Sequence, residues 1–293
     1  MPFQFAKVAP FIFVWLWSTG FIGAKYGLPY IEPFFMLFIR FLFVLLIFFA
    51  LVNFYRSKWL DMKQASQQIL IGTLIHGAYL AGVFFAIKEG VPAGVAAIVV
   101  GLQPIMTSII GKLFLAEPVN TKQSIGLILG FVGICLVIAE KFTLHTGSIS
   151  MLGLIACIIA LFSISIGTLL QKQLASHTPL LSGSFFQYIG ALFVVGILTI
   201  TTEQQVVIYS WELIGAMSWL VFGLSVLAIL LLLYMIREGE VAKVTSYFYL
   251  VTPVAVFQTW LLFDEKLGVY AILGALLTVI GVVIVVKNKP TTN

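Results

Sequence analysis

Long apolar runs separated by short polar segments make up almost the whole chain. Ten runs of about 20 residues, the length that a helix needs to cross a bilayer, can be read from the sequence. They cover residues 9–26, 33–55, 67–87, 92–115, 123–140, 150–171, 180–201, 213–235, 241–263 and 268–286. Apolar and polar residues do not alternate within the runs, as they would in the strands of a membrane barrel. The pattern therefore predicts an all-α membrane protein with ten transmembrane helices.

The composition excludes a water-soluble fold. The chain is 61% hydrophobic and only 9% charged, whereas a soluble domain carries about 25% charged residues. The first run follows Lys7 and resembles a signal peptide in its polarity. Because further apolar runs follow it along the whole chain, we interpret it as a retained first helix. Little sequence remains outside the runs, so no soluble domain is expected.

Lysine and arginine are concentrated on one side of the predicted membrane, which marks that side as cytoplasmic. With the N-terminus inside, this side holds Lys7, Arg56, Lys58, Lys63, Lys112, Lys122, Lys172, Arg237, Lys287 and Lys289. The opposite side holds Lys25, Lys88, Lys141 and Lys266. We therefore expect a multi-pass protein of the cytoplasmic (inner) membrane with both termini in the cytoplasm. The net charge of +5 follows from this bias, and nothing in it indicates a nucleic-acid partner.

One phrase of the sequence occurs twice, 149 residues apart. Ile-Lys-Glu-Gly at 87–90 recurs as Ile-Arg-Glu-Gly at 236–239, and a proline follows each copy at the same distance, Pro104 and Pro253. Each copy then leads to an acidic residue and a pair of glycines: Glu117 with Gly126 and Gly133, and Glu265 with Gly274 and Gly281. We therefore divide the chain into two related halves, residues 1–145 and 146–293. Five helices in each half would place the halves in opposite orientations, as in many carriers.

Several short motifs occur in a fixed order along the chain. They are Leu-Trp-Ser-Thr-Gly-Phe at 16–21 with Lys25, Phe-Ile-Arg-Phe at 38–41, Pro-Ala-Gly at 92–94, Leu-Gln-Pro at 102–104, and the turns at Glu117 and Glu265. With them the chain resembles the EamA family of the drug/metabolite transporter superfamily over nearly its whole length. The resemblance implies ten helices in two inverted five-helix repeats around a central cavity, and the export of amino acids and other small metabolites. Ala-Glu-Pro at 116–118 departs from the family's turn, so we expect Glu117 to act in helix capping alone.

Arg40 is the clear charge inside the predicted hydrocarbon region, and the eleven carboxylates all lie in loops or near the ends of runs. A buried carboxylate that exchanges a proton for a cationic drug is therefore not predicted. A charge at this depth costs at least about 2.5–3.5 kcal/mol, so it usually faces a cavity or a partner. Arg40 either attracts an anionic or zwitterionic substrate, whose carboxylate it would bind in bidentate fashion, or snorkels outward or pairs with a helix end or Glu32.

The candidate substrate-binding residues lie on the runs that hold the matching motifs. They are Trp17, Arg40, His76, Tyr79, Gln103, Gln187 and Tyr247. Gln187 matches Arg40 at an offset of 147, and each lies seven residues into its run, roughly 10 Å deep. His76, near the middle of its run, either contacts the substrate, couples transport to a proton, or packs between helices as a satisfied histidine. Pro104 and Pro253 would interrupt matching helices, which indicates either a nearby binding site or a kink that shapes the bundle.

The remaining inventory does not favour an enzyme. No phosphate-binding loop, metal-ligand motif or nucleophile with a base is present, and Cys135 and Cys157 have no partner ligands. We expect no cofactor and no metal, and energy from gradients or exchange. The glycine pairs in runs 123–140 and 268–286 are interpreted as packing contacts between halves or protomers. The expected partners are a small-molecule substrate, the lipid bilayer and, as a homodimer, a second copy of the chain.

The sequence thus predicts a secondary transporter that moves amino acids or related carboxylate-bearing metabolites outward by alternating access. A multidrug or purine/nucleoside exporter is the alternative within transport. A non-transporting membrane sensor or assembly protein on the same fold is the alternative from another class. A channel also fits the composition, and single-channel conductance would distinguish it from a saturable carrier.

Overall fold

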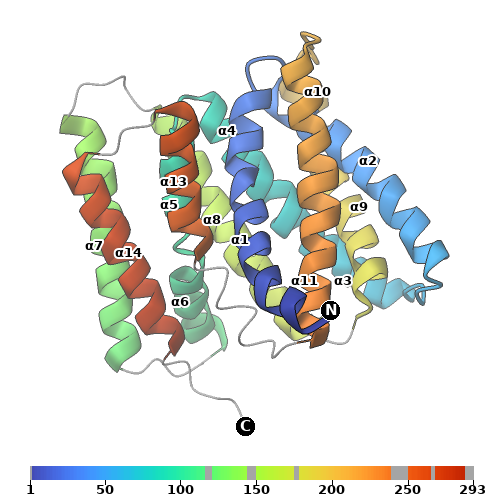
Figure 1. Cartoon of the computed structure of the whole chain (residues 1–293), viewed down its shortest axis with the longest axis horizontal. Coiled ribbons are helices and arrows are strands. Elements are labelled where there is room, and N and C mark those ends of the chain that lie inside the picture. Colours follow the sequence, from blue (N-terminus) through green and yellow to red (C-terminus); the bar gives the residue numbers. More distant parts are fainter. Residues whose placement is uncertain are drawn as a thin grey trace.

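The computed structural model of the chain describes residues 2–115, 121–143, 150–174, 178–238, 250–264 and 268–287. All named elements in these ranges are helices, and the antiparallel bridge between Ile31 and Val207 is isolated. Figure 1 shows the helices as a bundle of rods that run in roughly the same direction. The predicted all-α class is confirmed.

The helical segments follow one another along the chain with two π-helical segments, η1 and η2, among them. They are α1 (Pro2–Gly27), α2 (Pro33–Phe54), α3 (Met62–Gly72), η1 (Thr73–Ala78), α4 (Tyr79–Lys88), α5 (Ala93–Val100), α6 (Gln103–Leu115), α7 (Thr121–Thr143), α8 (Met151–Leu174), α9 (Leu180–Thr202), α10 (Trp211–Ser218), η2 (Trp219–Ala228), α11 (Ile229–Glu238), α13 (Val251–Phe263) and α14 (Val269–Lys287). The segments α3, η1 and α4 form one rod, and α10, η2 and α11 form another.

Seven helices in the described part of the chain are long and apolar enough to cross a membrane. They lie at Val8–Gly27, Pro33–Phe54, Met62–Lys88, Ala93–Leu113, Met151–Leu174, Leu180–Thr202 and Trp211–Leu232. Three shorter apolar helices lie at Ser124–Gly133, Val251–Phe263 and Ile272–Ile284, inside three further predicted runs. Each predicted run therefore contains an apolar helix, and the chain is a multi-pass membrane protein.

The two π-helical segments occupy matching positions in the sequence. A shift of 149 residues, the offset of the repeated phrase, places η1 inside η2. In a π turn the backbone hydrogen bond joins residues five apart instead of four, and such turns are rare and concentrated at functional sites. The positions of η1 and η2 therefore direct attention to the side chains that they hold.

Both predicted kink residues lie in the first turn of a helix. Pro104 is the second residue of α6, and the interruption before it falls at Gly101 and Leu102. Pro253 is the third residue of α13, and residues 239–249 before that helix lie outside the described ranges. Proline is well placed in a first turn because its missing N–H has no acceptor inside the helix there. At Pro104, therefore, the proline begins a new helix after a break and does not bend a continuous one.

Helices α7 and α14 pack against each other along the edge of the bundle (Figure 1). A Cβ atom at Gly133 would lie 2.5 Å from the carbonyl oxygen of Gly274, and one at Gly281 would lie 2.5 Å from that of Gly126. These are the glycines that follow the two copies of the repeated phrase. Only residues without a side chain allow the two backbones to approach this closely. The predicted packing role of these glycines is confirmed.

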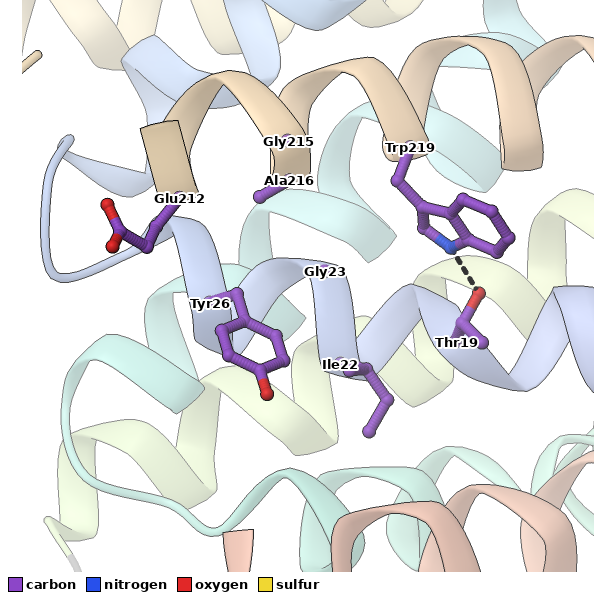
Figure 2. Close-up of a pocket in the computed structure, with 8 residues that line it drawn as sticks. All are labelled: Thr19, Ile22, Gly23, Tyr26, Glu212, Gly215, Ala216 and Trp219. Atoms are coloured by element: carbon purple, nitrogen blue, oxygen red, sulfur yellow. Dashed lines mark hydrogen bonds between the residues drawn. The ribbon is translucent and has the colours of Figure 1, made fainter. Parts of the chain in front are cut away.

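Helix α1 lies against α10 and η2 through small residues. A Cβ atom at Gly23 would lie 2.7 Å from a methyl carbon of Leu220, so the Leu220 side chain occupies the space that glycine leaves. At the edge of the contact, the indole Nε1 of Trp219 donates a hydrogen bond of 2.7 Å to the hydroxyl of Thr19 (Figure 2). The first residue of η2 is thereby attached to α1.

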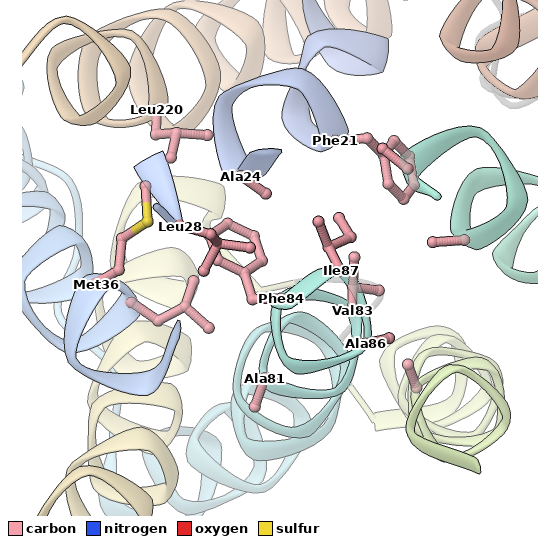
Figure 3. Packing of buried hydrophobic residues seen from close by; sticks show 14 of the residues in the cluster. Phe21, Ala24, Leu28, Met36, Ala81, Val83, Phe84, Ala86, Ile87 and Leu220 are labelled. Carbon is pink, nitrogen blue, oxygen red and sulfur yellow. The ribbon is translucent and has the colours of Figure 1, made fainter. Parts of the chain in front are cut away.

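The largest group of buried apolar side chains extends across α1, α2, α4, α5, α8, α9 and η2. Figure 3 shows Leu28, Met36, Phe84 and Ile87 meeting in this interior, with Leu220 of η2 at its edge. Phe84 and Met36 are almost completely buried. Since lipid is as apolar as these side chains, the close packing of the helices stabilises them more than the removal of apolar surface from water does.

Helices α2 and α9 pack together, and each is anchored at its start by the segment that follows the other. The carboxylate of Glu203, just after α9, accepts hydrogen bonds of 2.7 Å from the N–H groups of Phe34 and Phe35 in the first turn of α2. At the start of α9, the hydroxyl of Ser182 donates a hydrogen bond of 2.6 Å to the carbonyl of Lys58, after α2. A carboxylate at a helix N-terminus is favourable because of the exposed N–H groups and the helix dipole.

The Glu203 anchor makes stability depend on pH in a defined direction. Partial burial raises the pKa of Glu203 above its ordinary value, against the opposing effects of the Phe34 and Phe35 N–H groups. A raised pKa means that the folded protein holds the proton more tightly than the unfolded chain. Acidification from neutral pH toward the ordinary glutamate pKa of 4.5 is therefore expected to raise the melting temperature of the wild type relative to a Glu203→Gln variant. A difference that stays constant over this pH range would contradict the assignment.

Candidate functional site

Arg40 is buried in α2, with 4% of its surface exposed, and is held by a residue of η2. Its Nε and Nη2 atoms donate hydrogen bonds of 3.2 and 2.9 Å to the hydroxyl of Ser225. The Ser225 hydroxyl in turn donates a hydrogen bond of 3.1 Å to the carbonyl of Leu220. Leu220 lies five residues earlier, which is the spacing of the π turn. The π turn thus presents a hydroxyl oxygen to the guanidinium.

Arg40 has no carboxylate partner within the described residues. Glu32, the partner that the sequence left open, instead accepts from the backbone N–H groups of Gln204 and Val206. The Nη1 atom of Arg40 makes no hydrogen bond to any described residue. Among the described residues, the acceptor for this buried positive charge is therefore one neutral hydroxyl, which leaves the guanidinium able to bind an anion.

His76 lies in η1 and is held by a network of three glutamine side chains. Its Nε2 atom is 3.1 Å from the Oε1 atom of Gln187. The amide nitrogen of Gln187 donates hydrogen bonds of 2.6 Å to Gln68 and 2.8 Å to Gln171, which uses both of its N–H groups. The Gln187 oxygen therefore accepts from His76, and the Nδ1 atom of the neutral ring is left as an acceptor.

Tyr188 joins the arginine and the histidine into one cluster. Its ring stacks on the His76 ring with centroids 4.6 Å apart and an interplanar angle of 13°. It also lies beside Ser225, and both Tyr188 and Tyr79 are within electrostatic range of the Arg40 guanidinium. We call this set the polar cluster: Arg40, Gln68, His76, Tyr79, Gln171, Gln187, Tyr188 and Ser225. It provides one fixed positive charge, two phenols and a row of amides, and no carboxylate.

The two main contacts of the polar cluster match each other in sequence. Gln187 follows Arg40 by 147 residues, and Ser225 follows His76 by 149. Arg40 of α2 binds Ser225 of η2, whereas Gln187 of α9 binds His76 of η1. Each bond therefore joins the second apolar run of one predicted half to the π-helical turn in the third run of the other half.

The other predicted site residues have different surroundings. Gln103 donates a hydrogen bond of 2.8 Å to Thr168, which joins α6 to α8. Trp17 packs against Phe13 and lies at the border of a second hydrophobic core formed by residues of α1, η2, α11 and α13. Tyr247 lies outside the described residues. The structure thus brings together Arg40, His76, Tyr79 and Gln187, and places Gln103 and Trp17 in separate contacts.

Four members of the polar cluster were not among the predicted site residues: Gln68, Gln171, Tyr188 and Ser225. A signal for Ser225 was present, because it lies at the repeat offset from His76. Gln68 and Gln171 lie near the ends of their runs, where a polar residue is ordinary. Only the packing of α3, α8 and α9 shows that both side chains face Gln187.

Comparison with known proteins gives the context of this cluster. The model of the EamA-like transporter family matches residues 6–139 and again residues 151–287. The chain is 27% identical to a "Probable amino-acid metabolite efflux pump" of Escherichia coli (strain K12), over 94% of this chain and 93% of that protein. It is also 27% identical to "Uncharacterized transporter YvbV" of Bacillus subtilis (strain 168), over 94% and 89% of the two chains. A solved crystal structure covers 96% of this chain and 96% of its own with a TM-score of 0.66 and 17% identity, which shows a common fold.

Proposed function

Because the chain belongs to the EamA-like transporter family, we propose that it is a secondary transporter that exports amino acids or related carboxylate-bearing metabolites across the cytoplasmic membrane. The observation that carries this substrate class is the buried Arg40 guanidinium, which has no carboxylate partner among the described residues. The name of the Escherichia coli relative supports the same class. The relatives of this chain bear the names of transporters and efflux pumps, which supports a carrier over an enzyme.

A carboxylate is the group that best complements the polar cluster. Guanidinium binds carboxylate through two parallel N–H···O bonds, and the free Nη1 atom of Arg40 with the adjacent Nη2 supplies such a pair. Tyr79 and Tyr188 offer hydroxyl donors close to the same charge. A cationic drug would meet repulsion from Arg40 and no carboxylate in the cluster. The multidrug alternative is therefore disfavoured for cationic drugs. Export of purines or nucleosides remains the alternative, because their flat bases could stack on the rings of His76 and Tyr188.

We further propose that the transporter consists of two inverted five-helix repeats, residues 1–145 and 146–293, and works by alternating access. Three observations support this proposal: the two matches to the family model, the matched pairs Arg40–Ser225 and Gln187–His76, and the matched glycine contacts of α7 with α14. Rocking of one half against the other would break and re-form the two cross-half bonds around the substrate. The packed pair α7 and α14 would stay fixed and, in a homodimer, would be the face offered to the second protomer.

The test is transport by the purified protein in proteoliposomes. Labelled amino acids should show saturable counterflow, with and without a pH gradient, and an unlabelled amino acid inside should accelerate uptake of the labelled one. Saturable counterflow of nucleosides or drugs alone would assign the runner-up substrate class. Conductance in single-channel recordings would indicate a channel, and no flux of any solute would support the sensor or assembly role.

The glutamine network provides a second test of the site. Gln187→Leu should lower saturable flux about tenfold, because it leaves the side-chain oxygens of Gln68 and Gln171 and the ring of His76 without their partner. Gln204→Leu, in the exposed segment after α9, is the matched control and should transport at the wild-type rate. Equal rates for both variants would remove the network from the site.

A further inference from the structure

A groove between α1 and α10 opens at the surface of the bundle, on the opposite side of α1 from its buried contacts with α4. Four residues of α1 and four of α10 and η2 line it: Thr19, Ile22, Gly23, Tyr26, Glu212, Gly215, Ala216 and Trp219 (Figure 2). Its volume is about 380 Å³. Apart from Glu212, the exposed lining is apolar or aromatic, because the Thr19 hydroxyl is already bonded to Trp219.

The residues that flank the groove indicate that it faces lipid. Trp15 lies one helical turn from Thr19 and is 49% exposed, and Phe222, three residues after Trp219, is 63% exposed. Trp211, one turn before Gly215, is 85% exposed. In a membrane protein, large apolar side chains on an open helix face contact acyl chains, and tryptophan and tyrosine gather at the headgroup level. The end of the groove near Trp211 and Glu212 is then at the level of the headgroups.

Glu212 gives this end of the groove a charge. It lies in the first turn of α10, and its carboxylate has no hydrogen bond or ion pair with the described residues. Trp219 follows Glu212 by seven residues, which corresponds to about 10 Å along the helix. This is the distance from the charged end of the groove to the Trp219–Thr19 pair. A ligand that complements the groove therefore has a cationic head near Glu212 and an apolar tail along Ile22, Ala216 and Trp219.

We propose that this groove binds a phospholipid with a primary ammonium headgroup, phosphatidylethanolamine. The ammonium group donates to the Glu212 carboxylate beside the Tyr26 ring, and one acyl chain lies over Gly215, where a Cβ atom would meet nothing within 4 Å and the absence of a side chain leaves room. A free amino acid carries the same ammonium group, but its carboxylate would remain without a partner among these apolar side chains. The combination of one carboxylate and an apolar channel open to the bilayer selects the lipid.

The bound lipid would stabilise the part of the fold that holds the polar cluster. Trp219 lines the groove, bonds to Thr19 of α1 and begins η2, and η2 holds Ser225 against Arg40. An acyl chain packed over this contact joins α1 to η2 more firmly. Lipid binding itself does not depend on the proposed substrate, so its test can succeed or fail independently of transport.

The test measures thermal unfolding of the full chain in detergent with added dioleoyl phosphatidylethanolamine or dioleoyl phosphatidylglycerol. For the wild type, the ethanolamine lipid should raise the melting temperature by about 2–4 °C more than the glycerol lipid. Glu212→Gln should remove this difference. Gly215→Leu should fold, since a Cβ atom there meets nothing within 4 Å, and should lose the shift because its side chain fills the groove. Ile214→Leu, an exposed neighbour outside the lining, is the matched control and should keep the shift.

Three results would overturn the proposal. The first is an equal shift with both lipids in the wild type. The second is a full ethanolamine-lipid shift in Gly215→Leu or Glu212→Gln. The third is a shift produced by free alanine in place of lipid and lost in Gly215→Leu, which would assign the groove to the transported substrate.

Discussion

Replacing Arg40 with alanine is expected to lower the initial rate of amino-acid flux, at substrate concentrations below saturation, by about 30-fold to 100-fold. The loss corresponds to about 2–3 kcal/mol, the contribution of hydrogen bonds between a buried guanidinium and a carboxylate. The flux of the Arg40→Lys variant should lie between those of the wild type and Arg40→Ala, because lysine keeps the charge but not the planar pair of donors. The rates are measured in proteoliposomes with equal amounts of each variant.

The Arg40 prediction includes a readout that a structural role alone would not change. Wild-type protein should prefer an amino acid over its carboxamide, and Arg40→Ala should lose this preference because the group that reads the carboxylate is absent. Lys25→Ala is the matched control, since the Lys25 ammonium lies over the Phe263 ring, 4.3 Å from its centroid, in a contact between α1 and α13. Its flux should stay within about twofold of wild type, the size of effect expected away from a binding site. Unchanged flux in Arg40→Ala would remove the main support for the substrate class.

Substitution of Gly72 by alanine is expected to destabilise the fold by about 3 kcal/mol or more. A Cβ atom at Gly72 would overlap the backbone of Gln187, and one at Gly190 would overlap the carbonyl of Ile69, so α3 and α9 touch backbone to backbone. Overpacking typically costs about 1–3 kcal/mol, and the cost here lies at the upper end or above because a backbone cannot give way as a flexible side chain does. Separation of the two helices would also break the bond of Gln187 to Gln68.

The matched control for Gly72→Ala is Gly196→Ala on α9. A Cβ atom at Gly196 would lie 3.4 Å from the ring of Phe38, an ordinary contact. This variant should unfold at or slightly above the wild-type temperature, because alanine favours a helix over glycine by about 1 kcal/mol. The stability of both variants is measured by size-exclusion chromatography and thermal unfolding in detergent. Equal stability of the two variants would show that α3 and α9 do not approach this closely.

Some members of the site could be predicted because their signal is local. Arg40 is conspicuous as a charge inside an apolar run, His76 as an imidazole at mid-depth, and Gln187 through the repeat offset. The first two predictions need only the residue and its position in a run, and the third needs only the alignment of the two halves. Trp17 and Gln103 are predicted from their position on runs with the matching motifs, yet their contacts lie elsewhere, because residues on one run face different neighbours around the helix.

The all-α membrane class, the ten apolar runs and the repeat offset follow from the sequence alone, because burial in lipid imposes length and composition on every helix separately. Which polar side chains meet depends on how the helices pack in three dimensions. Ser225 became the partner of Arg40, Gln68 and Gln171 the partners of Gln187, and Gly72 and Gly190 the points of closest approach. The physical reason is that a polar group in lipid must find its partner on another helix, and rotation and crossing of helices are set by the packing of all of them together.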